Sequence, residues 1–276
     1  MKRGLVSGLC LRSGMSRQNY YARRKERHRE SVDGELVVLL VKRERCSQPR
    51  MGGRKLSKVI HGELLEHGVE IGRDRFFEVL RENGLLVEPK PRKPKTTQSR
   101  HSLPVFHNLV AGLTLTAPNQ AWASDLTYIR TQEGFMYAAL ITDMYSRKIV
   151  GHFIGDNLEA EGCIHSLLEA QKGLPPGVRP IHHSDRGCQY CCHLYVKQLQ
   201  SMGMGISMTE IMHCYENALA ERVNGILKQE YELDATFPTK ELAQKAFEQA
   251  VWLYNNRRPH MALDYQIPGE VHRLAA

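Results

Sequence analysis

The stretch that begins near Ala117 constrains the fold most, because three extended segments follow one another there before any helix is expected. These segments are rich in β-branched and aromatic residues, are joined by short glycine- or serine-containing connections, and cover residues 121–130, 135–145 and 148–156. The elements expected after them alternate in type: a helix at 158–172, a strand at 179–185, a helix at 192–202, a strand at 205–209 and a last helix from about 217. This order predicts an α/β fold in which helices cover both faces of a mixed sheet.

The last expected helix, within residues 207–231, has two chemically different faces. Its apolar side chains recur at helical spacing and are expected to face the core: Leu219, Val223, Ile226 and Leu227. The opposite face is expected to look outward and carries Asn217, Glu221, Asn224, Gly225 and Lys228. A carboxylate near an amide and a lysine can place a metal ligand beside a phosphate contact. For Glu221 taken alone, an ordinary amphipathic surface helix is the alternative.

Two further acids accompany Glu221, and both lie on or at the end of expected strands. Asp125 is inside the first extended segment, and Asp185 ends the fourth, just before a turn signal. Asp185 comes sixty positions after Asp125, and thirty-five residues lie between Asp185 and Glu221. Three converging carboxylates would repel one another by about 4 kcal/mol per pair at ~4 Å and an effective dielectric of ~20. Such a trio therefore favours bound cations.

Four motifs occur in a fixed order along the chain: WASDLTYI, HHSDRGCQY, YENALAERVNGILK and YNNRRPHMAL. From about residue 45 to the C-terminus, the chain resembles the second-reading-frame (orfB-type) transposases of insertion-sequence family three, which are relatives of retroviral integrases. The resemblance implies an RNase H-like integrase core in which Asp125, Asp185 and Glu221 form a DDE motif. It further implies that these acids are catalytic and hold two Mg²⁺ ions, which Mn²⁺ can replace, for DNA strand cleavage and strand transfer in transposition.

Charge is distributed unevenly along the chain. Residues 1–100 contain 24 lysines and arginines against 12 acids, a net charge of +12, whereas residues 101–276 have a net charge of −4. This asymmetry predicts a nucleic-acid-binding front and a catalytic body whose acids hold cations. We expect five segments: a basic N-terminal segment (1–30), an all-α helix-turn-helix-like domain (31–88), a basic proline-rich linker (89–116), the catalytic core (117–235) and a C-terminal helix with a basic tail (236–276).

Candidate DNA contacts follow from this division. Two short helices ending at Gly68 and Gly84 form a helix-turn-helix candidate, for which a small helical bundle with solvated arginines is the alternative. Its expected DNA contacts are Lys58, Arg73 and Arg75. The linker is either a basic track along the phosphate backbone or a plain spacer, and its candidates are Lys90, Arg92, Lys93 and Lys95. The remaining candidates come from the Glu221 helix and the C-terminal tail: Lys228, Arg222, Asn224, Arg257 and Arg258.

The seven cysteines are odd in number and follow no regular framework, which favours a reducing compartment. No run of eighteen apolar residues occurs, so we expect no membrane association and a cytoplasmic, nucleoid-associated protein. A zinc site built from Cys188, Cys191, Cys192 and nearby histidines is not predicted, because its second ligand pair would be two adjacent histidines on a strand. The expected partners are DNA, namely the terminal inverted repeats and target DNA, further copies of the chain, and the product of an upstream reading frame.

Two other functions remain open on the sequence alone. One is an RNase H-like nuclease that only hydrolyses DNA, and the other is a DNA-binding regulator with an inactive core. The three acids at the family's separations disfavour the second. Asp143 also lies in an expected strand, but a following turn offers it local hydrogen bonds, so we predict a structural role for it.

Overall fold

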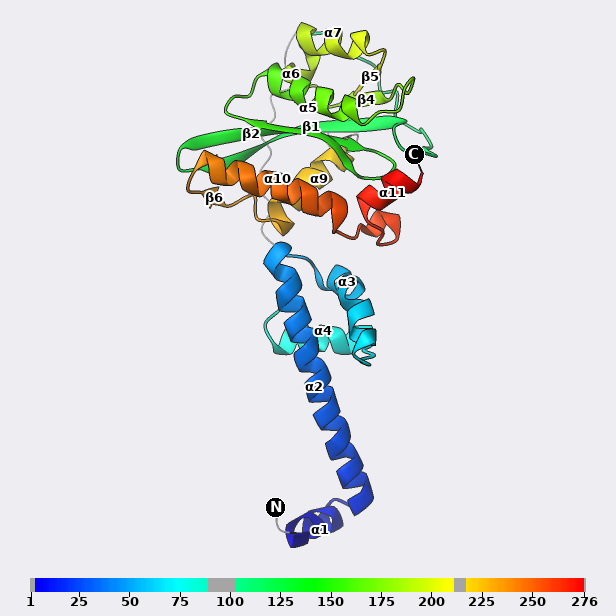
Figure 1. Cartoon of the computed structure of the whole chain (residues 1–276), viewed down its shortest axis with the longest axis vertical. Coiled ribbons are helices and arrows are strands. Elements are labelled where there is room, and N and C mark those ends of the chain that lie inside the picture. The colour runs from blue at the N-terminus through cyan, green and yellow to red at the C-terminus, as the bar shows by residue number, and fades with distance from the viewer. Residues whose placement is uncertain (1–2, 89–102, 211–216, 276) are drawn as a thin grey trace. The chain divides into compact units, whose positions relative to one another are not determined.

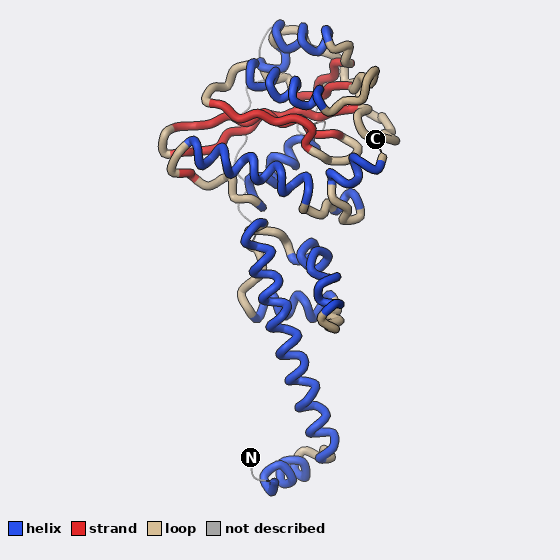
Figure 2. Tube along the Cα trace, viewed as in Figure 1, coloured by secondary structure: helices blue, strands red, loops and turns tan. Residues whose placement is uncertain are grey.

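The computed structural model describes residues 3–88, 103–210 and 217–275. The chain divides into two compact units: a smaller one formed by Met1–Ser47 and Met51–Glu88, and a larger one formed by Gln48–Arg50 and Pro89–Ala276. The smaller unit is entirely helical where it is described, whereas the larger one places helices on a sheet (Figure 2). No helix in the described ranges is both long enough and apolar enough to cross a membrane.

The helical unit is built on one long helix. Where this unit is described, its helices are α1 (Arg3–Arg12), α2 (Arg17–Ser47), α3 (Gly53–Glu66) and α4 (Arg73–Glu82). One side of α2 packs on α3 and α4 through a small apolar core that includes Val37, Leu40, Leu56, Ile60, Phe76 and Leu80. The predicted pair of short helices is therefore confirmed, and each is followed by a glycine with positive φ, Gly68 and Gly84.

One boundary of the expected division is wrong. We predicted a break between residues 30 and 31, but α2 runs through this position without interruption. The sequence from Arg17 to Asp33 contains neither proline nor glycine, so nothing in it ends a helix. The basic N-terminal segment is continuous with the first helix of the expected DNA-binding domain.

The larger unit contains a six-stranded mixed sheet. Its strands are β1 (Ala121–Thr131), β2 (Gly134–Asp143), β3 (Ile149–Gly155), β4 (Ile181–Ser184), β5 (Gly205–Met208) and β6 (Thr236–Phe237). Along the sheet the order is β3-β2-β1-β4-β5, with β6 pairing β1. β2 pairs antiparallel with both β1 and β3, while the β1–β4, β4–β5 and β1–β6 pairs are parallel. This topology confirms the predicted fold class.

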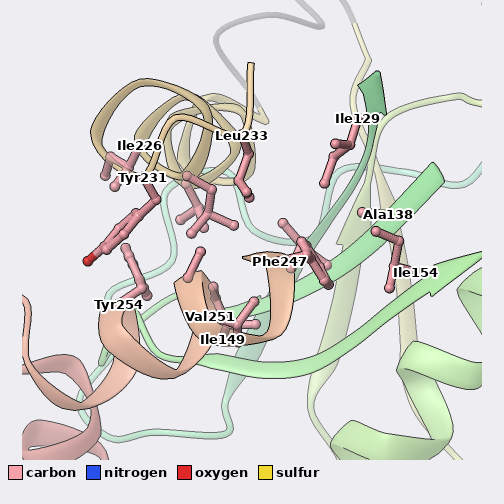
Figure 3. Close-up of a cluster of buried hydrophobic side chains, with 14 of the residues drawn as sticks. Ile129, Ala138, Ile149, Ile154, Ile226, Tyr231, Leu233, Phe247, Val251 and Tyr254 are labelled. Atoms are coloured by element: carbon pink, nitrogen blue, oxygen red, sulfur yellow. The ribbon is translucent and has the colours of Figure 1, made fainter. Parts of the chain in front are cut away.

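Helices cover both faces of this sheet (Figure 1). In its described residues, the helices of the larger unit are α5 (Ala160–Lys172), α6 (Cys188–Cys191), α7 (His193–Ser201), α9 (Ala218–Glu230), α10 (Lys240–Asn256) and α11 (Pro268–Leu274), with the 3-10 turn η1 (Met261–Leu263). On one face, α5, α6 and α7 enclose a core around Trp122. On the other face, α9 and α10 pack on Ile129, Ala138 and Ile154 of the sheet (Figure 3).

Two further expected boundaries fall inside the packed unit. Part of the expected linker docks on the core, because Leu103 and Phe106 pack against the Trp122 cluster. The expected C-terminal segment supplies β6 and α10, whose Phe247 and Tyr254 are fully buried in the second core. The apolar side chains of these flanking segments bury surface on the sheet, so the core extends beyond 117–235 on both sides.

Asp143 organises a turn, as predicted. Its buried carboxylate accepts hydrogen bonds from the backbone N–H groups of Asn119 (2.7 Å) and Ser146 (2.7 Å) and from the Ser146 hydroxyl (2.8 Å). His272 of α11 bonds to the same Ser146 hydroxyl at 2.9 Å through Nδ1. The carboxylate is thus fully engaged in holding the β2–β3 turn and the C-terminal helix.

Candidate active site

The pairing of β1 with β4 brings Asp125 and Asp185 close together. The two strands run parallel, and their last paired residues are Ser124 and Ser184, both almost completely buried. Asp125 and Asp185 are the next residue on each chain. β4 ends here whereas β1 continues to Thr131, so the two acids occupy neighbouring positions at the point where the β1–β4 pairing ends.

A tight turn holds the Asp185 carboxylate. The backbone N–H of Gly187 donates to Oδ1 of Asp185 at 2.9 Å. A Cβ on Gly187 would lie 3.0 Å from the same oxygen, a tight approach that would require the carboxylate to shift slightly. Next to it, the Arg186 guanidinium donates through Nε to the Thr209 carbonyl at 2.6 Å, which ties the turn to the end of β5.

Helix α9 carries Glu221 and is fixed to β1 by two asparagines. At its N-terminus the Asn217 amide donates to the Ser124 carbonyl at 3.0 Å. Further along the helix, the Asn224 amide donates to Oδ2 of Asp125 at 2.8 Å. Glu221 lies between these two anchors in sequence and is half-buried in the first turn of the helix. The three predicted acids therefore lie near the point where the β1–β4 pairing ends.

The electrostatics of Asp125 show how closely the acids influence one another. Burial, repulsion by Asp185 and a smaller repulsion by Glu221 raise the pKa of Asp125 to about 7, against the lowering effect of the Asn224 hydrogen bond. The three acids nevertheless do not form a closed set of metal ligands. In the described part of the chain, no three His, Cys, Asp or Glu side chains are gathered closely enough to hold a metal ion.

A buried polar cluster beneath Asp125 was not predicted from the sequence. The Ser124 and Tyr195 hydroxyls converge on Nε2 of His182, at 2.6 and 2.8 Å, and all three residues are almost fully buried. Burial lowers the pKa of His182 to about 3, so the ring is neutral in this cluster. The adjacent pair of histidines in the sequence was the available signal, because a buried polar residue on a strand requires a partner.

The cysteines near the site are packed in different environments. Cys188 is exposed, whereas Cys191 is buried with its sulfur 3.6 Å from that of Met208. Cys192 donates its thiol to the Gln189 carbonyl at 3.2 Å. Burial is the main reason that the pKa of Cys191 is raised to about 11, which disfavours the thiolate form that binds metal.

The DNA contacts predicted on α9 have different surroundings. Arg222 is exposed, and Lys228 is partly buried with its ammonium 4.3 Å from the centre of the Tyr128 ring. Asn224 is 7 % exposed and its amide is bonded to Asp125. Asn224 therefore positions Asp125. This corrects our prediction that Asn224 contacts DNA.

The tail arginines differ in the same way. Arg257 is exposed, but Arg258 is buried and bonds to the Glu230 carboxylate through two nitrogens, both at 2.9 Å. Its guanidinium also lies over the Tyr254 ring. Arg258 therefore joins the end of α9 to the end of α10, and the predicted phosphate contact by this residue is wrong.

The predicted contacts in the helical unit lie on its surface. Lys58 is exposed on α3, Arg73 pairs with Asp74 at the start of α4, and Arg75 pairs with Glu78 and Glu82. Exposed pairs of this kind contribute little to stability and open readily. The predicted linker contacts Lys90, Arg92, Lys93 and Lys95 lie outside the described residues.

Comparison with known proteins identifies the family of the chain. Residues 116–214 and residues 202–268 each match a family described as "Integrase core domain". A 31 kDa protein of insertion element IS600 from Shigella sonnei is 33 % identical over 97 % of this chain and all of its own length. The transposase of IS904 from Lactococcus lactis is 31 % identical over 81 % of this chain and 88 % of its own.

Two further similarities were found. Transposase InsF of IS3A from Escherichia coli is 31 % identical, over 78 % of this chain and 74 % of its own. Among solved structures, a simian T-cell lymphotropic virus intasome in complex with PP2A regulatory subunit B56 gamma aligns at a TM-score of 0.49 and 18 % identity, covering 79 % of this chain and 73 % of that one. Because of its similarity to these relatives and its match to the integrase core family, the chain belongs to the insertion-sequence transposases of family three, enzymes with a DDE-type integrase core.

Proposed function

We propose that Asp125, Asp185 and Glu221 are the catalytic residues of this transposase and that they hold divalent cations, with Mg²⁺ as the natural ion and Mn²⁺ as a substitute. The observation that carries this proposal is the proximity of the three acids where the β1–β4 pairing ends, with the pKa of Asp125 raised to about 7. Burial and neighbouring negative charges disfavour the ionised carboxylate, so a bound cation would stabilise it.

The donor set fits a hard cation. The three side chains offer only oxygen ligands, which Mg²⁺ prefers, and it keeps several of its waters. Two buried amide oxygens near these acids, Oδ1 of Asn217 and of Asn224, accept no hydrogen bond from any residue in the described ranges. Such oxygens suit the water molecules around a bound cation. Divalent cations would activate the attacking oxygen and stabilise the leaving oxygen of a phosphodiester.

The protein's own groups would orient this chemistry. Asn224 fixes the rotamer of Asp125, and Gly187 fixes that of Asp185 through its backbone N–H. Glu221 is carried by a helix that Asn217 anchors to the end of β1. The nucleophile is water when a strand is nicked and a DNA 3′ hydroxyl when strands are joined, so no protein nucleophile is required.

The DNA-binding surfaces are also proposals. We assign recognition of the element's DNA ends to the helical unit, with Lys58, Arg73 and Arg75 as DNA contacts. We assign nonspecific affinity for DNA to the linker. On the catalytic unit we assign Lys228, Arg222 and Arg257 to DNA phosphates. We further propose that copies of the chain assemble on DNA in the bacterial cytoplasm, and that an upstream reading-frame product contributes to activity.

A denaturing-gel assay separates transposition from the alternative of hydrolysis alone. The full chain is incubated with labelled element ends and Mg²⁺, and cleaved strands are resolved from joined ones. We expect both species with the unaltered protein and neither with Asp185→Asn, while DNA binding persists. Glu161→Gln, which neutralises an exposed acid on α5, is the matched control and should leave both products unchanged.

Two outcomes would contradict the proposal. Normal joining by Asp185→Asn would remove this residue from the catalytic set. Cleavage without any joined species, by the chain or by its fusion with the upstream product, would favour a nuclease that only hydrolyses.

A further inference from the structure

Tyr128 and Lys228 form a contact that nothing in the three-acid site requires. The Lys228 ammonium lies 4.3 Å from the centre of the Tyr128 ring, well within the range of a cation–π interaction. The contact joins β1, which carries Asp125, to α9, which carries Glu221. It therefore links the two elements that supply two of the acids.

The same two elements are tied together at two successive levels. At the first level Asn224 donates to Asp125, and at the second Lys228 meets Tyr128. Tyr128 is three residues beyond Asp125, roughly 10 Å along a strand, and Lys228 is four residues beyond Asn224, roughly 6 Å along a helix. The helix thus follows the strand away from the acids, and the ammonium is held at a definite distance from them.

The Tyr128 ring is itself held from another side. Phe135, on the paired strand β2, meets it edge-to-face with centroids 5.5 Å apart. The guanidinium of Arg130, two residues along β1, lies 5.9 Å from the ring centre. Tyr128 is 38 % exposed and Phe135 50 % exposed, so this aromatic pair lies at the surface rather than in a core.

The surroundings contain one acid as well as the two cations. A small hollow beside the ring is lined by Tyr128, Arg130, Lys228, Leu233 and Asp234. Asp234 is thus the other residue in this hollow that is able to position the ammonium. An experiment must therefore distinguish the effect of the Tyr128 ring on Lys228 from the effect of Asp234.

We propose that Tyr128 is a positioning residue, whose ring holds the Lys228 ammonium beside Arg130 so that the two cations bind consecutive phosphates of a DNA end entering the three-acid site. This inference rests on the proposed role of Lys228 and adds to it the group that fixes its geometry. A lysine side chain is long and flexible, and ordering it before DNA arrives lowers the entropy lost on binding. A ring face can do this without neutralising the charge that the phosphate needs.

The test is a double-mutant cycle in the full chain. Tyr128→Phe keeps a ring face, whereas Tyr128→Leu removes it, and each is made with and without Lys228→Ala. Phe135→Leu is the control for loss of an exposed aromatic residue, and Asp234→Asn is the control for the acid. The readouts are joining of pre-nicked ends and Mg²⁺-dependent hydrolysis of nonspecific DNA.

We expect Tyr128→Phe to join within about twofold of the unaltered protein and Tyr128→Leu to lose about five- to tenfold in joining, with hydrolysis little changed. The loss should disappear when Lys228 is already alanine, because the ring acts through the ammonium. Normal joining by Tyr128→Leu, a loss that adds in full to that of Lys228→Ala, or a loss seen with Asp234→Asn or Phe135→Leu instead would each overturn the proposal.

A second measurement does not depend on activity. After reductive ¹³C-methylation, the NMR signal of Lys228, assigned by its absence in Lys228→Arg, should be shifted by the aromatic ring current. The shift should persist in Tyr128→Phe and vanish in Tyr128→Leu, and an unshifted signal in the unaltered protein would overturn the positioning role. Failure of the three-acid assignment would look different, since Asp185→Asn would then join DNA while the ring-current shift remained.

Discussion

Replacing Asp125 by asparagine should stabilise the metal-free protein at neutral pH. Asparagine keeps an oxygen that can accept the hydrogen bond from Asn224, now 2.8 Å from the carboxylate, but it removes a charge from a site where burial and two neighbouring acids disfavour it. A pKa raised from 3.8 to about 7 corresponds to about 4 kcal/mol of unfavourable free energy once the group is ionised in the folded state. This figure is the upper limit of the expected gain.

The pH dependence has a definite sign. Below about pH 4 the carboxyl is protonated in both the folded and the unfolded chain, so the variant should gain nothing. Between about pH 4 and pH 7 the folded protein holds a proton that the unfolded chain has released, and the stability of the unaltered protein therefore falls as pH rises. The advantage of the variant should grow over this interval and level off above pH 7.

Urea unfolding followed by tryptophan fluorescence measures this change in stability in the larger unit of the chain, which contains Asp125. Both tryptophans, Trp122 in the core and the exposed Trp252 on α10, belong to the larger unit. Asp264→Asn, a neutralisation at an exposed left-handed position that asparagine tolerates, is the matched control. Added Mg²⁺ should stabilise the unaltered protein and not the variant. A variant that is equally or less stable, or a difference that does not change with pH, would refute the reasoning.

Three further outcomes follow from other parts of the structure. Arg258→Ala should lower the free energy of unfolding by about 3–5 kcal/mol, because it removes both hydrogen bonds and the positive charge that Arg258 supplies to the partly buried Glu230, while Arg257→Ala should change it little; equal effects in urea unfolding would contradict this. Gly151→Ala should cost about 3 kcal/mol, since its Cβ would lie 2.1 Å from the Ser166 carbonyl oxygen, whereas Gly225→Ala has open space and should be neutral or stabilising by the same assay. Neutralising Lys90, Arg92, Lys93 and Lys95 should weaken binding to all DNA equally, and the slope of log affinity against log salt should flatten by about 0.9 for each phosphate that the linker no longer neutralises; weakening confined to the element ends would contradict the linker's nonspecific role.

The sequence predicted the sheet well because its strands carry strong local signals. β-branched and aromatic runs mark β1 to β3, and helical spacing marks α9, so the grouping of Asp125, Asp185 and Glu221 was predicted from the order of elements together with the family's motifs. The turn around Asp143 was predictable for the same reason, since the hydrogen bonds that its carboxylate accepts come from nearby residues except for that of Asn119.

What the sequence did not reveal depends on contacts between distant segments. Arg258 reads as a surface cation, and only the approach of α9 and α10 shows that Glu230 neutralises it. Asn224 lies on the polar face of its helix, yet that face meets β1 rather than solvent. The packing of Tyr128 against Lys228 likewise joins residues one hundred positions apart, for which local patterns carry no information.

The most direct test of the three-acid account is the joining rate of pre-nicked element ends with Mg²⁺, measured side by side for Asp125→Asn, Asp185→Asn, Glu221→Gln and the triple variant. Residues that act as one unit show strongly non-additive losses. We therefore predict that each single substitution lowers joining to the level of the triple variant, with folding and DNA binding retained. A single variant that keeps joining within about tenfold of the unaltered protein, or three losses that add independently up to that of the triple variant, would contradict the account.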